Sequence, residues 1–168
     1  MRLLFEESWQ TVLAHHGRLG LMLGMNTPDL WKKLIVPTDF SACSQPALAA
    51  AADLQQRSGA EVVLLHVTEP AYEGLRVQTG ELHGQMKQAA EIALKKITAE
   101  HFSHAAKVRL LVKEGRPADV ICRVAAEEAA DAVIIPTHGH SGLKHVLLGS
   151  VAEKVVRHAP CSVLVVRE

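Results

Sequence analysis

The residues of this sequence best suited to chemistry are glycines and a hydroxyl near its carboxyl end. Gly139 and Gly149 lie on either side of a polar loop, and Ser150 directly precedes a helical pattern over residues 151–158. Glycine lets the backbone approach a ligand closely, and the first turn of a helix leaves N–H groups without partners inside the helix. Such N–H groups beside a hydroxyl are a typical site for a phosphate.

The same residues also fit an interpretation that needs no ligand. Ser150 followed by Glu153 is the pattern of a capping box, in which the two side chains satisfy N–H groups at the start of the helix. A cap of this kind stabilises a helix by about 1 kcal/mol. The residues alone leave phosphate binding and capping equally open.

A second polar pair, Thr38 and Asp39, follows an apolar run over residues 33–37. The Asp39 carboxylate would accept hydrogen bonds from the hydroxyls of a ribose. It would equally complement the start of a helix that the pattern places near Ser41. Both roles stay open at this point.

The sequence predicts neither a metal site nor a catalytic residue. Ten histidines are present, but His138 and His140 are separated by one glycine, and no H-x3-H pair or Cys/His cluster accompanies them. Cys43, Cys122 and Cys161 are far apart, which predicts reduced thiols in a cytoplasmic protein. The sequence contains no P-loop, no paired acids near the glycine loop and no clear base held against a nucleophile. His138 and His140 are candidates for a general base or phosphate acceptor, but a histidine in a glycine loop more often supports loop packing.

Composition limits the size of the fold and the class of partner. The 168 residues suffice for one α/β domain, and 48% hydrophobic with 4% aromatic content predicts an aliphatic core. Eighteen basic residues balance eighteen acidic ones, so we expect no nucleic acid and no anionic membrane as the main partner. No apolar run approaches the roughly 20 residues of a membrane span.

Alternating strand and helix patterns supply the elements that must position these residues. Together they predict a single open five-stranded parallel sheet with helices on both faces, an α/β Rossmann-like fold. The expected strands are residues 33–37, 61–67, 107–113, 132–135 and 163–166, and the expected helices are 41–57, 81–102, 117–129 and 151–158. Ligands of such sheets bind beyond the carboxyl ends of the strands, where Asp39 would face the glycine loop and Val67 would be an apolar neighbour.

Four motifs resemble the universal stress protein family. They are PTDFS at residues 37–41, LLHV at 64–67, EGRPADVI at 114–121 and the segment 137–166, within a match over about residues 32–167. The resemblance implies a nucleotide-binding fold of the adenine nucleotide alpha hydrolase-like type. It also implies a homodimer in which the last strand, between Val163 and Val166, pairs across the two-fold axis.

The family's ATP-binding members carry a G-x2-G-x9-G-[ST] loop. Gly139 matches its second glycine, and Gly149 with Ser150 closes the pattern after nine intervening residues. Pro136 occupies the position of the first glycine, where it provides no N–H and a fixed φ near −65°. We therefore expect an altered affinity or base preference, with binding retained.

Carried over by position, the resemblance assigns ten residues to a site for ATP with Mg²⁺. Those expected near the adenosine are Pro37, Thr38, Asp39, Val67, Ile135 and Pro136, and those expected at the phosphates are Gly139, Gly149, Ser150 and Val151. The function implied is a cytoplasmic, nucleotide-dependent dimeric regulator of a stress response, read by a regulatory protein partner. The alternatives are a slow ATPase or autophosphorylating enzyme, and a nucleotide-free dimeric scaffold for a protein partner.

Residues 1–30 lie outside the family match and precede a universal stress protein domain at 31–168. Apolar residues including Phe5, Trp9, Val12 and Leu13 recur at near-helical spacing, which suits a short amphipathic helix. Disorder is the other expectation for this extension. A regulatory arm and an artefact of start-codon choice both remain open explanations of its presence.

Overall fold

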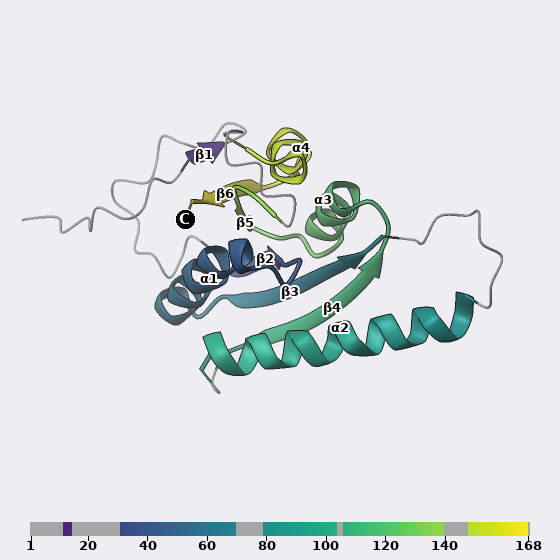
Figure 1. The fold of residues 1–168 in the computed structure, drawn as a ribbon. Helices are drawn as coiled ribbons and strands as arrows, with labels where there is room; N and C mark the ends of the chain where they lie inside the picture. Colours follow the sequence, from purple (N-terminus) through teal and green to yellow (C-terminus); the bar gives the residue numbers. More distant parts are fainter. Residues whose placement is uncertain (1–11, 15–30, 70–78, 104–105, 140–147, 168) are drawn as a thin grey trace, which may run out of the picture.

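The aliphatic runs of the sequence form the expected parallel sheet of five strands (Figure 1). The computed structural model describes residues 12–14, 31–69, 79–103, 106–139 and 148–167. The parallel strands are β2 (Lys33–Pro37), β3 (Glu61–Thr68), β4 (Val108–Glu114), β5 (Ala132–Pro136) and β6 (Ser162–Val166). The helices are α1 (Gln45–Ser58), α2 (Thr79–His101), α3 (Pro117–Glu127) and α4 (Ser150–His158), with a short 3-10 turn, η3, at Ala42–Ser44.

The order of the strands reverses at the centre of the sheet. The chain adds β3 and β4 on one side of β2, then crosses over and adds β5 and β6 on the other side, which gives the order β6-β5-β2-β3-β4. The neighbours among these five strands are parallel. This arrangement confirms the predicted α/β fold and creates a switch point between β2 and β5.

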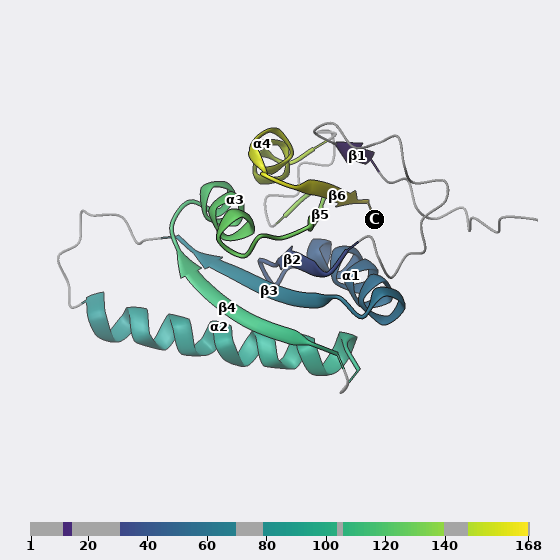
Figure 2. The same cartoon turned by 180° about the vertical axis from the view of Figure 1, so that it is seen from behind.

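Alternate residues of each strand supply two apolar cores, one on each face of the sheet. On one face Leu34 packs with Leu48 of α1 and Leu94 of α2. On the other, Ile35 packs with Val124 of α3, in a cluster that extends to α4. Figures 1 and 2 show these two pairs of helices on opposite sides of the sheet. No helix in the described ranges is both long and apolar enough to cross a membrane.

The first helix begins later than the sequence pattern suggests. We expected one helix from Ser41, whereas the structure has η3 at Ala42–Ser44 and then α1 from Gln45. Pro46 explains the break, because proline is favoured in the first turn of a helix and disrupts its interior. The residues before it are therefore left to form the loop beside the cavity described below.

A short strand from the amino-terminal extension joins the sheet at its β6 edge. This strand, β1 (Val12–Ala14), pairs antiparallel with β6, with Val12 opposite Val165 and Ala14 opposite Val163. It lies within the stretch whose spacing suggested an amphipathic helix. The rest of that stretch falls outside the described residues.

The amino ends of β2, β3 and β4 are joined by an ion-pair cluster. Lys33 Nζ lies 3.1 Å from a carboxylate oxygen of Glu128 and 3.7 Å from one of Glu61. Arg109 Nε lies 3.2 Å from Glu61, and its guanidinium also donates to Glu128. The hydrogen bond from Arg109 is the main reason that the pKa of Glu128 is lowered. At the same end, the Asp131 carboxylate accepts a hydrogen bond from the Lys33 amide at 2.8 Å.

Candidate functional site

The sheet splits at its carboxyl end, between its two central strands. β2 and β3 stay in register as far as Pro37 and Leu65, and β5 and β6 as far as Pro136 and Val166. β2 and β5, in contrast, pair only at Leu34–Ala132 and Ile35–Val133. Because both strands end in proline, neither last residue has an N–H with which to extend the ladder. The split therefore leaves a crevice at the switch point, where ligands of such sheets bind.

A cavity of about 520 Å³ occupies this crevice. Its volume is in the usual range for small-ligand sites, roughly 300–1,000 Å³. All ten residues assigned to a site from the sequence border it: Pro37, Thr38, Asp39, Val67, Ile135, Pro136, Gly139, Gly149, Ser150 and Val151. The fold thus brings together residues that are separated by as much as two thirds of the chain.

Other residues border the cavity without having been assigned to it. They are Ser44, Leu65, Glu69, Pro117, Ile121, Thr137, His138 and Ala152. Leu65 shares a face of β3 with Val67, which was assigned to the site, so the alternation of side chains along the strand could have indicated it. Pro117 and Ile121 lie one turn apart on α3, and no assigned residue of that helix pointed to them. Glu69 follows the end of β3, and no local pattern marked it.

The loop after β2 is held by hydrogen bonds within the loop and by one to the neighbouring strand β3. Thr38 is 6% exposed, and its amide donates to the Leu65 carbonyl at 2.9 Å. Its hydroxyl lies 3.1 Å from the hydroxyl of Ser44 and accepts from the Phe40 amide at 3.1 Å. The Ser44 hydroxyl donates in turn to the Ser41 carbonyl at 2.7 Å. These bonds fix the turn that carries Asp39.

The Asp39 carboxylate serves both the loop and the cavity. One oxygen accepts the amide of Ser41 at 3.0 Å and its hydroxyl at 2.6 Å, so local complementation of the turn, one of the two open roles, is present. The other oxygen lies against Gly139 across the split, since a Cβ on Gly139 would come within 2.8 Å of it. Any larger residue at position 139 would displace this carboxylate.

The start of α4 shows that the capping-box interpretation was wrong. The N-cap is Gly149, in extended backbone, and no side chain caps the helix. Ser150 is already the first helical residue, and Glu153 instead pairs with Arg157 on the next turn. The Gly149 amide donates to the Thr137 carbonyl at 2.7 Å, which ties the helix start to the end of β5. The first turn, Ser150 to Ala152, borders the cavity without a side-chain cap.

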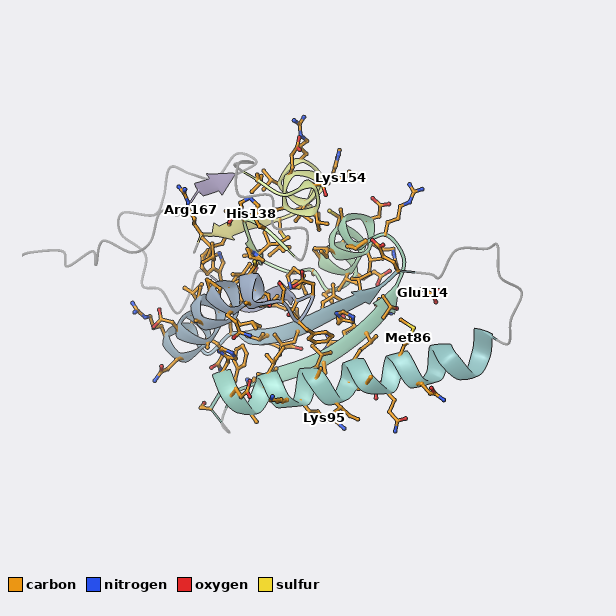
Figure 3. The ribbon with its side chains drawn as sticks, viewed as in Figure 1. Met86, Lys95, Glu114, His138, Lys154 and Arg167 are labelled. Atoms are coloured by element: carbon orange, nitrogen blue, oxygen red, sulfur yellow. The ribbon has the colours of Figure 1, made fainter. Side chains whose placement is uncertain are left out.

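The described wall of the cavity carries acids and a histidine. Asp39, Glu69 and His138 border it, and no lysine or arginine does so among the described residues. Lys154 of α4 points away from the sheet (Figure 3). Three or more side chains grouped to hold a metal ion are not found within the described ranges. Among the described residues, N–H groups and the dipole of α4 are what this site offers to phosphate charge.

Comparison with known proteins agrees with this geometry. Residues 30–167 match the model of the universal stress protein family. Universal stress protein MJ0531 of Methanocaldococcus jannaschii is 35% identical over 146 residues, which are 85% of this chain and 86% of that protein. Universal stress protein MJ0577 of the same organism is 30% identical over 155 residues, covering 82% and 96%.

Solved structures show the same fold. That of MJ0577 covers 83% of this chain and 97% of its own, with a TM-score of 0.71 and 30% identity. A universal stress protein solved in complex with cAMP covers 82% and 98%, with a TM-score of 0.60 and 22% identity.

Proposed function

Because the chain belongs to the universal stress protein family, we propose that it binds ATP at the carboxyl ends of its strands and acts as a nucleotide-dependent regulator of a stress response. The observation that carries this proposal is the cavity at the switch point, with Asp39 on one side and the uncapped first turn of α4 on the other. The cAMP complex of another universal stress protein supports a nucleotide as the class of ligand.

Each part of the nucleotide has a counterpart in the cavity. Val67 and Ile135 offer apolar surface to the base, and Asp39 offers a carboxylate oxygen to the ribose hydroxyls. The N–H groups at the start of α4 and the Ser150 hydroxyl suit the phosphates. Mg²⁺ would be held chiefly by phosphate oxygens and would offset the negative charge of the acids in the wall.

Pro136 is the proposed cause of a difference from family members with glycine at this position. It borders the cavity at the end of β5 and contributes no donor there. We propose that it changes the affinity or the base preference of the site and leaves binding intact.

One observation favours an enzymatic alternative, slow autophosphorylation. His138 Nδ1 lies 3.1 Å from the Thr137 hydroxyl, and both residues border the cavity. A histidine that accepts a hydroxyl proton activates the oxygen as a nucleophile. Transfer of the γ-phosphoryl group to that oxygen would move the proton to His138 and release ADP. An intact-mass measurement after incubation with ATP and Mg²⁺ tests this, since Thr137→Val would abolish the gain of one phosphoryl group.

The assembly proposed with this function is a homodimer through β6. Two copies related by a two-fold axis would pair their β6 strands antiparallel, and β1 already lies antiparallel on that edge. Dimerisation in this manner therefore requires β1 to leave the edge. We expect Leu13→Pro, which weakens a strand of three residues, to raise the dimer fraction in sedimentation velocity. A monomer at all concentrations in both proteins would reject this part of the proposal.

We propose that the protein acts in the cytoplasm. A regulatory protein partner would distinguish its nucleotide-bound form from its nucleotide-free form. Cys43, Cys122 and Cys161 form no disulfide with one another, which is typical of a reducing compartment. If the loop stayed empty, the same dimer would instead serve as a nucleotide-free scaffold for that partner.

Calorimetric titration of the nucleotide-stripped protein with ATP and Mg²⁺ separates these functions. Saturable binding of one ATP per subunit, lost in Gly149→Val, is the expected result. A Cβ at position 149 would lie 3.2 Å from the Thr137 carbonyl oxygen, whereas one at Gly84 meets nothing within 4 Å, so Gly84→Val is the matched control. Absence of heat together with an unchanged melting temperature in excess ATP would leave only the scaffold.

A further inference from the structure

The backbone is strained next to the residue proposed to bind the ribose. Phe40, which directly follows Asp39, has a φ of +64°, in the left-handed region that non-glycine residues seldom adopt. Such a conformation persists only where surrounding contacts determine it, and it is frequent at binding sites. The contacts that hold Phe40 therefore also decide where the Asp39 carboxylate lies.

A histidine on the neighbouring strand holds this turn at two points. The ring of His66, in β3, stacks on the ring of Phe40 with centroids 4.2 Å apart and an interplanar angle of 27°. Its Nδ1 lies 2.8 Å from the carbonyl oxygen of Thr38. A carbonyl only accepts, so the hydrogen of this bond is on Nδ1. His66 thus holds the residue before Asp39 and the residue after it.

His66 acts from outside the cavity. Leu65 and Val67, its neighbours in β3, both border the cavity and belong to the core of α3 and α4. Because side chains alternate along a strand, His66 faces the other side of the sheet, where Phe40 packs against the core of α1 and α2. It therefore does not line the site, and any effect on a ligand must pass through the turn.

We propose that His66 is a positioning residue that clamps the Thr38–Phe40 turn and thereby aims the Asp39 carboxylate at the ribose hydroxyls. This rests on the proposed nucleotide function and adds to it the source of ribose recognition. β3 thus contributes twice to the proposed site: Val67 contacts the base, and His66 fixes the Asp39 carboxylate that contacts the ribose.

Three substitutions separate the two contacts. His66→Asn keeps a donor near the position of Nδ1 and loses the ring, His66→Phe keeps a ring and loses the donor, and His66→Leu loses both. The readout is the ratio of affinities for ATP and 2′,3′-dideoxy-ATP, which differ only in the hydroxyls that Asp39 would bind. A general loss of stability weakens both ligands alike and leaves this ratio unchanged.

The expected result is a preference of the unsubstituted protein for ATP that falls toward unity in His66→Leu, with His66→Asn and His66→Phe intermediate. Affinity for the dideoxy nucleotide should stay within about twofold. His66→Leu added to Asp39→Ala should cause no further loss, since both act on the same contact. An unchanged ratio in His66→Leu, with ATP still bound, would overturn the positioning role and leave the nucleotide function standing.

Amide hydrogen exchange of the ligand-free protein tests the positioning role of His66 independently. Faster exchange at Phe40 and Ser41 in His66→Leu, with core amides unchanged, is expected if His66 clamps the turn. If the unsubstituted protein bound neither nucleotide, the proposed nucleotide function would be wrong. In that case, exchange at Phe40 and Ser41 that is the same in His66→Leu as in the unsubstituted protein would overturn the clamp as well.

Discussion

The two ends of the sheet differ in how they use the same strands. β2 and β3 begin at Lys33 and Glu61, whose side chains join an ion-pair cluster with Glu128. The same strands end beside a cavity, where Pro37 and Val67 form part of its wall. At the amino end of the sheet, opposite charges pair with one another and join the strands. At the carboxyl end, β2 and β5 separate and leave the cavity between them.

The difference shows where stability and binding are placed in this molecule. At the amino end, the Glu128 carboxylate is ion-paired with both Lys33 and Arg109. At the carboxyl end, Asp39 and Glu69 lie in a cavity wall to which the described residues contribute no lysine or arginine. We therefore expect substitutions at the open end to change nucleotide affinity, and substitutions at the closed end to change stability.

Gly139→Ala should lower ATP affinity strongly. The added Cβ would lie 2.8 Å from the Asp39 carboxylate, whose other oxygen is held by Ser41. The displaced carboxylate would lose its hydrogen bonds to the ribose, and because a hydrogen bond to a charged group contributes about 1.5–3 kcal/mol, ATP affinity should fall on the order of tenfold to a hundredfold. Titration calorimetry measures it, with Gly84→Ala as the matched control. Equal affinities in the two variants would contradict the account of the split.

Pro136→Gly should have a smaller effect of opposite sign. Glycine restores an N–H at the end of β5 and removes the ring from the cavity wall, and one added hydrogen bond contributes about 1 kcal/mol. ATP affinity should rise about fivefold in the same titration. Weaker binding would show instead that the proline suits the ligand of this chain.

Glu128→Gln should leave ATP affinity unchanged and lower stability by at most about 1 kcal/mol at neutral pH, because the cluster is partly exposed. The Arg109 hydrogen bond lowers the pKa of Glu128, so its contribution is present above the unfolded-state pKa of about 4.3 and is lost as the pH falls through the lower folded value. Urea unfolding at pH 7 and pH 3 tests this. The gap between the two proteins should shrink at pH 3, and a constant gap would argue against the ion pair.

Cys161 should react slowly with an alkylating agent, and bound ATP should have no effect on that rate. Burial raises the pKa of this thiol to about 11, so little thiolate is present at pH 8. Labelling in the native protein, followed by peptide mapping, should be on the order of a hundredfold slower than in the unfolded chain. Excess ATP should not alter that rate, since Cys161 directly precedes β6 at the opposite end of the sheet. Slower labelling of Cys161 in the presence of ATP would show that the nucleotide binds away from the cavity.

The strands and the residues around the cavity could be predicted because their signals are local or carried by motifs. Aliphatic runs mark β2 and β5, and glycines mark the loop. The start of α4 was mispredicted because the pattern of Ser150 and Glu153 does not determine which residue becomes the N-cap. That choice depends on the bond from the Gly149 amide to Thr137, which forms only in the fold.

His66 and Phe40 could not be assigned for a similar reason. The bond from His66 to Thr38 joins residues 28 apart in the chain, and nothing beside either one indicates it. A left-handed aromatic residue is also uncommon enough that sequence reasoning does not expect it. The pairing of β1 likewise depends on the free edge of β6, which hydrophobic spacing within residues 1–30 does not reveal.

The most direct test of the central claim is amide hydrogen exchange with and without ATP and Mg²⁺, compared between the two ends of the sheet. We expect ATP to slow exchange at Asp39 to Ser41 and in the first turn of α4, and to leave Glu61 and Asp131 unchanged. Protection at the ion-paired end, or no change at either end under saturating ATP, would contradict the assignment of binding to the open end.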